Sequence, residues 1–323
     1  EFYIMLEITQ LTYTAIIGFL IVVILGPIFI PMLTKFKFGQ TVRDDGPQTH
    51  LQKNGTPTMG GVIMIIAILI TGLTRAKIDK DLLVGLICIT GFGLVGFLDD
   101  FIKIKMKRSL GLKAYQKIIL QFALALFVSY YQYSASPSAT QMMVPFTDIV
   151  INLGPLYVPI MMFVIIGTVN AVNLTDGLDG LASGVTLIVS IFFMMLAISV
   201  GNSDVGILAA ATGGACLGFL GFNSYPAKVF MGDTGSMALG GAVVAFAVLT
   251  NSVLLIPIVG GIYFAEAISV IIQVASFKLT GKRVFKMAPI HHHFEQCGWP
   301  ETRVVFVFWI TTVVLAWIGI IAV

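Results

Sequence analysis

Charged residues are scarce in this sequence of 323 residues. Only 11% of the chain is charged, whereas an ordinary soluble domain carries about 25%. Hydrophobic residues make up 57%, and the mean hydropathy is +0.97. A water-soluble fold of this length cannot hide so much apolar surface, so the composition excludes a soluble protein and predicts a membrane protein. The net charge of +3 is also too small to indicate a nucleic-acid partner, and we expect none.

Cysteine is scarce as well. The chain has only Cys88, Cys216 and Cys297, and their spacing fits neither a disulfide framework nor a zinc site. Cys88 and Cys216 lie inside apolar runs, where a small buried residue is the simplest interpretation. A cleaved signal peptide is not expected either, because the first apolar run is long and is followed by Pro and Lys residues.

Long apolar runs are what the sequence has in abundance. A helix needs about 20 apolar residues to cross a bilayer, and we find ten such runs, some of which must extend into their flanks. They predict an all-α polytopic membrane protein with about ten transmembrane helices, forming one integral-membrane catalytic domain over residues 1–323. The runs are Tyr13–Leu33, Met59–Leu73, Leu82–Leu98, Ile118–Tyr131, Val158–Val172, Leu181–Val200, Val205–Phe222, Met237–Thr250, Leu254–Ser276 and Val304–Val323.

The distribution of basic residues predicts the orientation. The loops after the odd-numbered runs hold 16 of the 19 Lys and Arg residues, and the opposite side holds only Arg75, Lys77 and Lys80. Because cytoplasmic loops carry an excess of Lys and Arg, we expect the odd-numbered loops in the cytoplasm and both termini outside. On the outer side, the apolar residues of Val144–Pro159 recur around Asn152-Leu153-Gly154-Pro155, which predicts a short β-hairpin.

A pair of adjacent carboxylates ends the third run. Asp99 and Asp100 are followed by a basic stretch from Lys103 to Lys117. On a helix, neighbouring side chains point about 100° apart, so the two Asp residues should have different roles. The pair is either part of a site beside a phosphate-binding basic loop, or an acidic turn that balances the basic stretch.

A second acidic segment, Asn173–Gly180, follows the fifth run. Asp176 and Asp179 would share one face of a helix, and Gly177 allows a ligand to approach the backbone. The segment could be only a helix end with Asx turns. However, it contains no Lys or Arg to neutralise its two carboxylates, and this favours a site.

A third segment, Asn223–Ser236, precedes the eighth run. Asp233 stands in a Gly-rich turn at the expected start of a helix. It could simply cap that helix. Helix starts and Gly-rich turns also bind phosphate, and a carboxylate there is a natural Mg²⁺ ligand.

Two further features are polar. His291, His292 and His293 are consecutive, a poor spacing for a zinc site, so we favour contacts with a substrate or phosphate. Within the ninth run, Glu266, Ser269 and Gln273 form a polar stripe at helical spacing. An ionisable residue inside a membrane indicates a function. A structural Glu that forms hydrogen bonds with neighbouring helices is the alternative, and the sequence does not distinguish the two.

Together these segments resemble the phospho-N-acetylmuramoyl-pentapeptide transferases, within the superfamily of polyprenyl-phosphate hexosamine-1-phosphate transferases. The triple His favours this branch over the enzymes that use N-acetylglucosamine. The resemblance covers nearly the whole chain. The matching stretches are Lys53–Gly61, Asp99-Asp100, Asn173–Gly180, Asn223–Ser236 and Pro289–Glu295.

The resemblance implies a homodimer in the bacterial inner (cytoplasmic) membrane, with its active site on the cytoplasmic face. It implies a Mg²⁺-dependent transfer of phospho-MurNAc-pentapeptide from UDP-MurNAc-pentapeptide to undecaprenyl phosphate, giving lipid I and UMP. Asp99, Asp100 and Asp233 would be catalytic, with Mg²⁺ on Asp233. The implied substrate-binding residues are Lys53, Thr58, Lys117, Asn173, Asp176, Gly177, Asp179, Asn223, Phe230, Gln273, His291, His292 and His293.

Two other functions stay open at this point. One is a sister enzyme that transfers GlcNAc-1-phosphate to a polyprenyl phosphate. The other is a transporter, for which Glu266 is the best support. A transporter is expected to carry ionisable groups near the middle of the membrane, whereas here nearly all of them lie at one face.

Overall fold

The computed structural model describes residues 2–35, 53, 55–106, 110–135 and 140–323. Within these ranges nearly all regular structure is helical, and nine helices are long and apolar enough to cross a membrane. The helices are α1 (Phe2–Lys35), α2 (Gly61–Arg75), α3 (Lys80–Met106), α4 (Ala114–Ala135), α5 (Tyr157–Thr175), α6 (Leu181–Val200), α7 (Ser203–Asn223), α8 (Gly232–Leu249), α9 (Ile256–Val259), α10 (Gly261–Thr280), α11 (Ile290–Gln296) and α12 (Glu301–Ile321).

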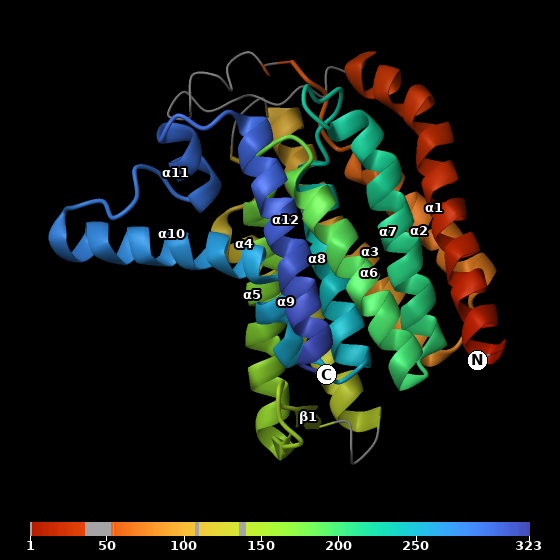
Figure 1. The fold of residues 1–323 in the computed structure, drawn as a ribbon. Coiled ribbons are helices and arrows are strands. Elements are labelled where there is room, and N and C mark those ends of the chain that lie inside the picture. The colour runs from red at the N-terminus through yellow and green to blue at the C-terminus, as the bar shows by residue number, and fades with distance from the viewer. Residues whose placement is uncertain (1, 36–52, 54, 107–109, 136–139) are drawn as a thin grey trace.

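The ten apolar runs correspond to α1 to α8, α10 and α12, which confirms the all-α polytopic membrane fold. Among them only α2, with 15 residues, is shorter than the usual membrane-spanning length. Most of these helices run side by side in one bundle, and the N- and C-termini lie toward the same end of it (Figure 1).

The ninth run is not the straight helix that the sequence analysis predicted. Residues Val253–Leu255 form a 3₁₀ turn, α9 follows for four residues, and α10 begins after Gly260. Pro257 stands in the first turn of α9, where its missing N–H costs nothing, and the Gly260-Gly261 pair lets the chain change direction. As a result α10 lies crosswise to the bundle (Figure 1).

The predicted β-hairpin exists, but its turn lies elsewhere. Strands β1 (Gln141–Met143) and β2 (Val150–Asn152) pair antiparallel, so residues 144–149 form the connection. The expected turn around Asn152–Pro155 is instead the lead into α5, because Gly154–Leu156 forms a 3₁₀ turn with Pro in its first positions. The Asn152 side chain accepts hydrogen bonds from the Thr140 hydroxyl and from the Gly154 N–H, and these bonds fix the end of the hairpin.

Helix α8 forms the centre of the bundle. Every residue from Thr234 to Leu249 is buried, and α2, α3, α5, α6 and α7 pack around it. A helix that is buried on all sides needs small residues where its neighbours come close. At Gly96 of α3, an added Cβ would overlap the backbone carbonyl of Asp233. This close approach brings the end of α3 against the start of α8.

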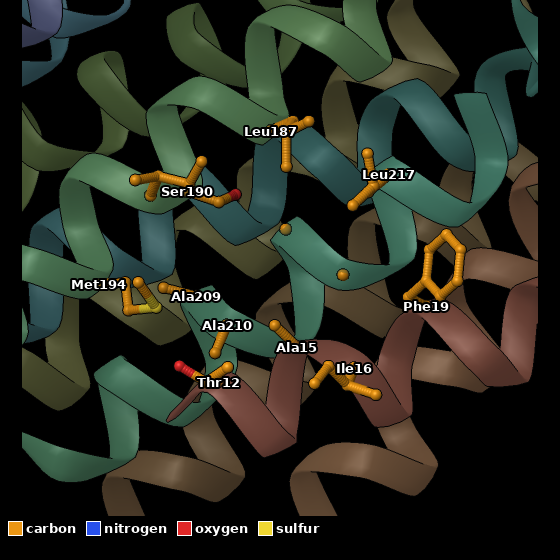
Figure 2. A pocket seen from close by; sticks show the side chains of 13 residues that line it. Thr12, Ala15, Ile16, Phe19, Leu187, Ser190, Met194, Ala209, Ala210 and Leu217 are labelled. Carbon is orange, nitrogen blue, oxygen red and sulfur yellow. The ribbon is translucent and has the colours of Figure 1, made fainter. Parts of the chain in front are cut away.

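A cavity of about 280 Å³ lies between α1, α6 and α7 (Figure 2). Thr12 and Ser190 are the only polar residues among those that line it. It contains no titratable side chain that could bind or activate a phosphate, so it is not the candidate active site.

Candidate active site

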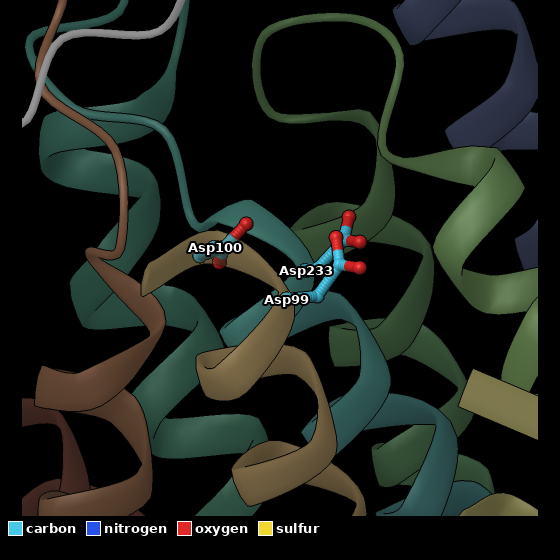
Figure 3. Close-up of side chains that lie close together, drawn as sticks. All are labelled: Asp99, Asp100 and Asp233. Atoms are coloured by element: carbon cyan, nitrogen blue, oxygen red, sulfur yellow. The ribbon is translucent and has the colours of Figure 1, made fainter. Parts of the chain in front are cut away.

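Three carboxylates meet where α3 ends and α8 begins. Asp99 and Asp100 stand near the end of α3, and Asp233 is the second residue of α8. A carboxylate oxygen from each residue lies within 4.8 Å of the other two. Asp99 and Asp233 point the same way, whereas Asp100 turns aside (Figure 3). The sequence-based expectation that the two adjacent Asp residues face different atoms is therefore correct.

Asp100 holds the first turn of α8. Its Oδ2 accepts hydrogen bonds from the Thr234 N–H at 2.9 Å and from the Thr234 hydroxyl at 2.8 Å. An acceptor at this position satisfies a free N–H of the helix start and lies at the positive end of the helix dipole. Gly232, with φ +70°, precedes this contact, and an added Cβ there would lie 2.5 Å from Asp100 Oδ2 and 2.8 Å from the Thr58 hydroxyl.

Asp99 faces the other way, toward basic groups. Its Oδ1 accepts a hydrogen bond from the Leu112 N–H at 2.8 Å, and its Oδ2 lies 2.6 Å from Lys103 Nζ. Lys103 stands four residues after Asp99, so both side chains lie on one face of α3. Lys103 Nζ also lies 3.6 Å from Asp100 Oδ1, so the two carboxylates share this lysine. Their closest partners differ, because Asp99 binds the segment between α3 and α4 and Asp100 binds α8.

Asp233 is not the cap of its own helix, because Met231 occupies that position and no side chain there makes the capping bond. Its Oδ1 accepts a hydrogen bond from Asn173 Nδ2 at 3.0 Å. Its Oδ2 lies 2.9 Å from Lys117 Nζ and 3.1 Å from Lys103 Nζ. The carboxylate is thus aimed away from α8 and into a cluster of polar groups from α3, α4 and α5.

This acidic cluster suits a divalent cation. Three carboxylates that converge within 4.8 Å offer the hard oxygen ligands that such ions prefer. The two lysine ammonium groups share Asp233 Oδ2 and bring positive charge to the same point. An arrangement of this kind can bind and neutralise the oxygens of a diphosphate.

A second network lies beside the acidic cluster and orders the segment Asp176–Gly180. Lys53 Nζ lies 2.6 Å from both Asp179 Oδ1 and Glu301 Oε1. Glu301 also accepts the Asp179 N–H, and Asp179 Oδ2 accepts the Ala227 N–H. Burial alone lowers the pKa of Lys53, but its hydrogen bonds with Asp179 and Glu301 outweigh burial and raise that pKa above its ordinary value.

Asn223 joins the same network from α7. Its Oδ1 accepts hydrogen bonds from the Gly180 N–H and the Ser183 hydroxyl, and its Nδ2 donates to the Val229 carbonyl. Its polar atoms therefore connect α6, α7 and the segment that leads to α8. Asp176 lies in the same segment, and burial together with the nearby charges of Asp233 and Asp100 raises its pKa well above the ordinary value.

The comparisons with known proteins agree with this geometry. The profile of Glycosyl transferase family 4 matches residues 82–251, and a phospho-N-acetylmuramoyl-pentapeptide-transferase signature matches residues 53–65. The phospho-N-acetylmuramoyl-pentapeptide-transferase of Clostridioides difficile (strain 630) is 80% identical over 320 residues, which cover 99% of each chain. The enzyme of that name from Alkaliphilus metalliredigens (strain QYMF) is 56% identical over 98% of this chain and 99% of its own.

The chain belongs to the phospho-N-acetylmuramoyl-pentapeptide-transferase family. The part that matches the family profile contains all three carboxylates of the acidic cluster, and the shorter signature contains Lys53 and Thr58. The matched ranges therefore include the acidic cluster and Lys53, whereas Glu301 lies outside them.

The remaining predicted residues of the family site lie at varying distances from the cluster. Phe230 is half-buried, and its N–H donates to the Pro57 carbonyl. Gln273 uses both ends of its amide to bind the backbone of Val284 and Phe285. These contacts fold the segment after α10 back onto that helix.

The three consecutive His residues have three different environments. His291 is buried and its Nδ1 lies 3.0 Å from Glu266 Oε1. His292 is half-buried and lies 2.7 Å from Glu295 Oε2. The Nδ1 atom of His293 accepts the Lys286 N–H. The rings of His291 and His292 lie close together, with their centroids 4.1 Å apart, although the nitrogens named above have different partners. That the three residues contact a substrate or phosphate rather than a metal stays a prediction.

Sequence reasoning missed two residues of the site. Lys103 was seen only as part of a basic stretch, although its spacing of four residues from Asp99 was a usable signal. Glu301 looked like an ordinary acidic residue at a helix start, because its contacts with Lys53 and Asp179 bridge very distant positions. Lys107 and Arg108 of the basic stretch, and Asn54 of the first matching stretch, lie outside the described residues.

Proposed function

We propose that the protein transfers phospho-MurNAc-pentapeptide from UDP-MurNAc-pentapeptide to undecaprenyl phosphate, releasing UMP and giving lipid I. The observation that carries this proposal is the 80% identity with a phospho-N-acetylmuramoyl-pentapeptide-transferase over 99% of both chains. The acidic cluster with its two lysines is the chemistry that such a transfer needs. Phosphoryl transfer between anions depends mainly on positioning and on neutralising charge.

The cation in this proposal is Mg²⁺. Asp233 would hold it, with an oxygen of Asp99 or Asp100, since these are the converging carboxylates. When bound, Mg²⁺ would neutralise diphosphate oxygens and stabilise the departing phosphate. Lys103 and Lys117 contribute positive charge at the same place and help to attract the anionic substrates.

The two adjacent carboxylates take separate roles in the proposal. Asp100 Oδ2 accepts two hydrogen bonds from Thr234 and so holds the turn of α8 that carries Asp233. Asp99 lies on the same side as Asp233 and next to Lys103 (Figure 3). Asp99 is therefore the better candidate for the base that acts toward the phosphate of the carrier.

The uridine part of the donor would lie beside the network of Lys53, Asp179 and Glu301. Asp176 and Gly177 are half-buried there and can meet a ligand through a side chain and a backbone group. Phe230 offers an aromatic face that can stack on uracil. Asn173 and Asn223 hold the surrounding segments together, and Thr58 is buried near Gly232. Gln273, His292 and His293 come from the side of α10 and α11.

The proposed location is the bacterial inner membrane with the site toward the cytoplasm. The support is the concentration of Lys and Arg in the loops at the end of the bundle that carries the acidic cluster. The homodimer that the sequence resemblance implies stays a prediction.

A nucleotide-release assay tests the function. The purified protein, undecaprenyl phosphate and Mg²⁺ are mixed with UDP-MurNAc-pentapeptide or with UDP-GlcNAc, and UMP is measured. We expect UMP with the first donor only. Release of UMP only with UDP-GlcNAc would identify the sister enzyme. Absence of UMP with both donors would contradict the transfer reaction and favour the transporter.

A further inference from the structure

Glu266 of α10 is a fully buried carboxylate, with an exposed fraction of 0%. Among the described residues no Lys or Arg forms an ion pair with it, and its one polar side-chain partner is His291, whose Nδ1 lies 3.0 Å from Glu266 Oε1. Burying a carboxylate inside a membrane protein costs free energy, so such a residue suggests a function. The proposed chemistry at the acidic cluster does not use it.

The His291 ring connects α10 with the segment Asp176–Gly180. His291 is 1% exposed, and its second nitrogen, Nε2, faces Gly177 so closely that an added Cβ at that glycine would overlap it. The ring therefore fills the space between Glu266 on one side and the Gly177 backbone on the other. The hydrogen bond between Nδ1 and Glu266 Oε1 fixes the direction of the ring.

The pair is not an obvious gain in stability. Glu266 Oε2 and His291 Nε2 are both buried, and neither has a hydrogen-bond partner among the described residues. A buried polar atom without a partner destabilises the folded state, because it gives up its hydrogen bonds with water. Buried ionic pairs can often be replaced by apolar residues without loss of stability. The presence of a pair with two unpartnered buried atoms favours a role other than holding the fold together.

We propose that Glu266 and His291 are positioning residues that set the place of the segment Asp176–Gly180, and through it the affinity for the uridine nucleotide. Glu266 orients the imidazole, and the imidazole supports the backbone at Gly177. The same segment contains Asp179, which is held on its other side by Lys53. This inference rests on the proposed function for the identity of the ligand. Because His291 is 1% exposed, it acts in this proposal through Gly177, whereas the sequence resemblance implies a direct contact with the substrate.

The decisive experiment replaces both members of the pair. The double variant Glu266→Leu with His291→Leu removes the buried polar groups together, so we expect its thermal unfolding temperature in detergent to equal or exceed that of the wild type. Its dissociation constant for UMP in the presence of Mg²⁺, measured by calorimetry, should rise at least about tenfold. Glu266→Gln, which keeps an acceptor for Nδ1, should restore most of the affinity that Glu266→Leu loses.

Ser269→Ala is the matched control on the same helix. Ser269 is also buried, but its hydroxyl donates only to the backbone carbonyl of Glu266 within α10. The affinity of the Ser269→Ala variant for UMP should stay within about twofold of the wild type. The lost hydrogen bond joins two residues of the same helix and so affects only α10. An unchanged UMP affinity in a stable double variant would overturn the proposal.

A second measurement decides the case in which the double variant does not fold. Gly177→Ala places a methyl group against His291 Nε2, and His291→Ala removes the ring. The two changes should be strongly non-additive in thermal unfolding, because the second makes room for the first. Additive losses would show that the ring does not support Gly177 and would overturn the proposal. Neither result depends on turnover, so a wild type that releases no UMP would contradict the proposed function alone.

Discussion

Two adjacent aspartates of α3 share Lys103 but differ in their closest partners, and this is the main result at the scale of residues. One step along a helix turns the side chain by about 100°. As a consequence Asp100 reaches the start of α8, whereas Asp99 reaches Lys103 and the Leu112 N–H. The sequence alone predicts that the two residues differ, but it cannot tell which residue takes which partner.

Asp100→Ala and Asp99→Ala should therefore fail in different ways. Loss of Asp100 leaves the first turn of α8 without its acceptor, so the free energy of unfolding should fall by about 1–2 kcal/mol. Loss of Asp99 should reduce turnover by at least about 100-fold. Its stability loss should be the smaller of the two, because relief of repulsion from Asp100 and Asp233 offsets the lost contacts with Lys103 and Leu112. Thermal unfolding in detergent and UMP release measure the two effects. Equal stability losses in both variants would contradict this division.

Asp233→Asn separates a metal ligand from a structural residue. Because Asp100 rather than Asp233 serves α8, the Asn variant should unfold at the wild-type temperature. It should lose nearly all turnover, because a neutral amide is a much poorer ligand for Mg²⁺ than a carboxylate. UMP release is measured over a range of Mg²⁺ concentrations, and a partial recovery at high Mg²⁺ is expected. Normal activity with unchanged Mg²⁺ dependence would move the cation to Asp99 and Asp100.

At the scale of elements, the start of α12 is tied to a distant segment. Glu301 accepts from Lys53 and from the Asp179 N–H, so one carboxylate joins three parts of the chain. Hydrogen bonds to charged groups contribute about 1.5–3 kcal/mol each when their partners are sheltered. The Lys53 side chain is 16% exposed, and water weakens its ion pair. We therefore expect a contribution at the lower end of this range.

Glu301→Gln should loosen the segment Asp176–Gly180 without unfolding the protein. We expect a loss of about 1 kcal/mol in stability and a rise in the KM for the UDP substrate, with the KM for undecaprenyl phosphate unchanged. Thr302→Ala, at the exposed neighbouring position of α12, is the control and should leave both KM values as they are. Equal effects on the two substrates would argue that Glu301 serves the fold in general.

Sequence patterns predicted the helices but not the bend before α10 or the position of the β-hairpin turn. The apolar runs located ten helices because membrane helices must be long and apolar. The bend before α10 was signalled by Pro257 and the Gly260-Gly261 pair, yet the run appeared continuous because hydropathy does not distinguish a straight helix from a broken one. The turn of the β-hairpin was misplaced because Gly154 and Pro155 also suit the first turn of a helix.

At the scale of the whole molecule, the long-range contacts could not be predicted from the sequence. Asp99 and Asp233 come together only because α3 and α8 touch at Gly96, and Glu301 meets Asp179 across 122 positions. Charge patterning, by contrast, could be read directly, since 16 of 19 basic residues fall on the loops of one side. The sequence thus predicts which end of the bundle carries the chemistry but not which residues pair there.

The orientation can be tested with a native cysteine. Cys297 is exposed beside α11, whereas Cys88 and Cys216 are buried. In cells freed of their wall, a membrane-impermeant maleimide should not label Cys297 until the membrane is permeabilised, because this side is expected in the cytoplasm. Cys297→Ser gives the background, and Asp148→Cys, exposed in the hairpin connection, should be labelled in intact cells. The opposite labelling pattern would reverse the orientation.

The central place of α8 has a consequence for how the protein responds to its lipid environment. Changes in bilayer thickness act on helices that face lipid, which tilt or bend to match the new thickness. Helices α1 and α12 expose many apolar side chains, but α8 is enclosed by other helices and carries Asp233 at its first turn. A thinner or thicker membrane should therefore tilt the outer helices before it displaces Asp233, so the reacting groups are mechanically insulated from the bilayer.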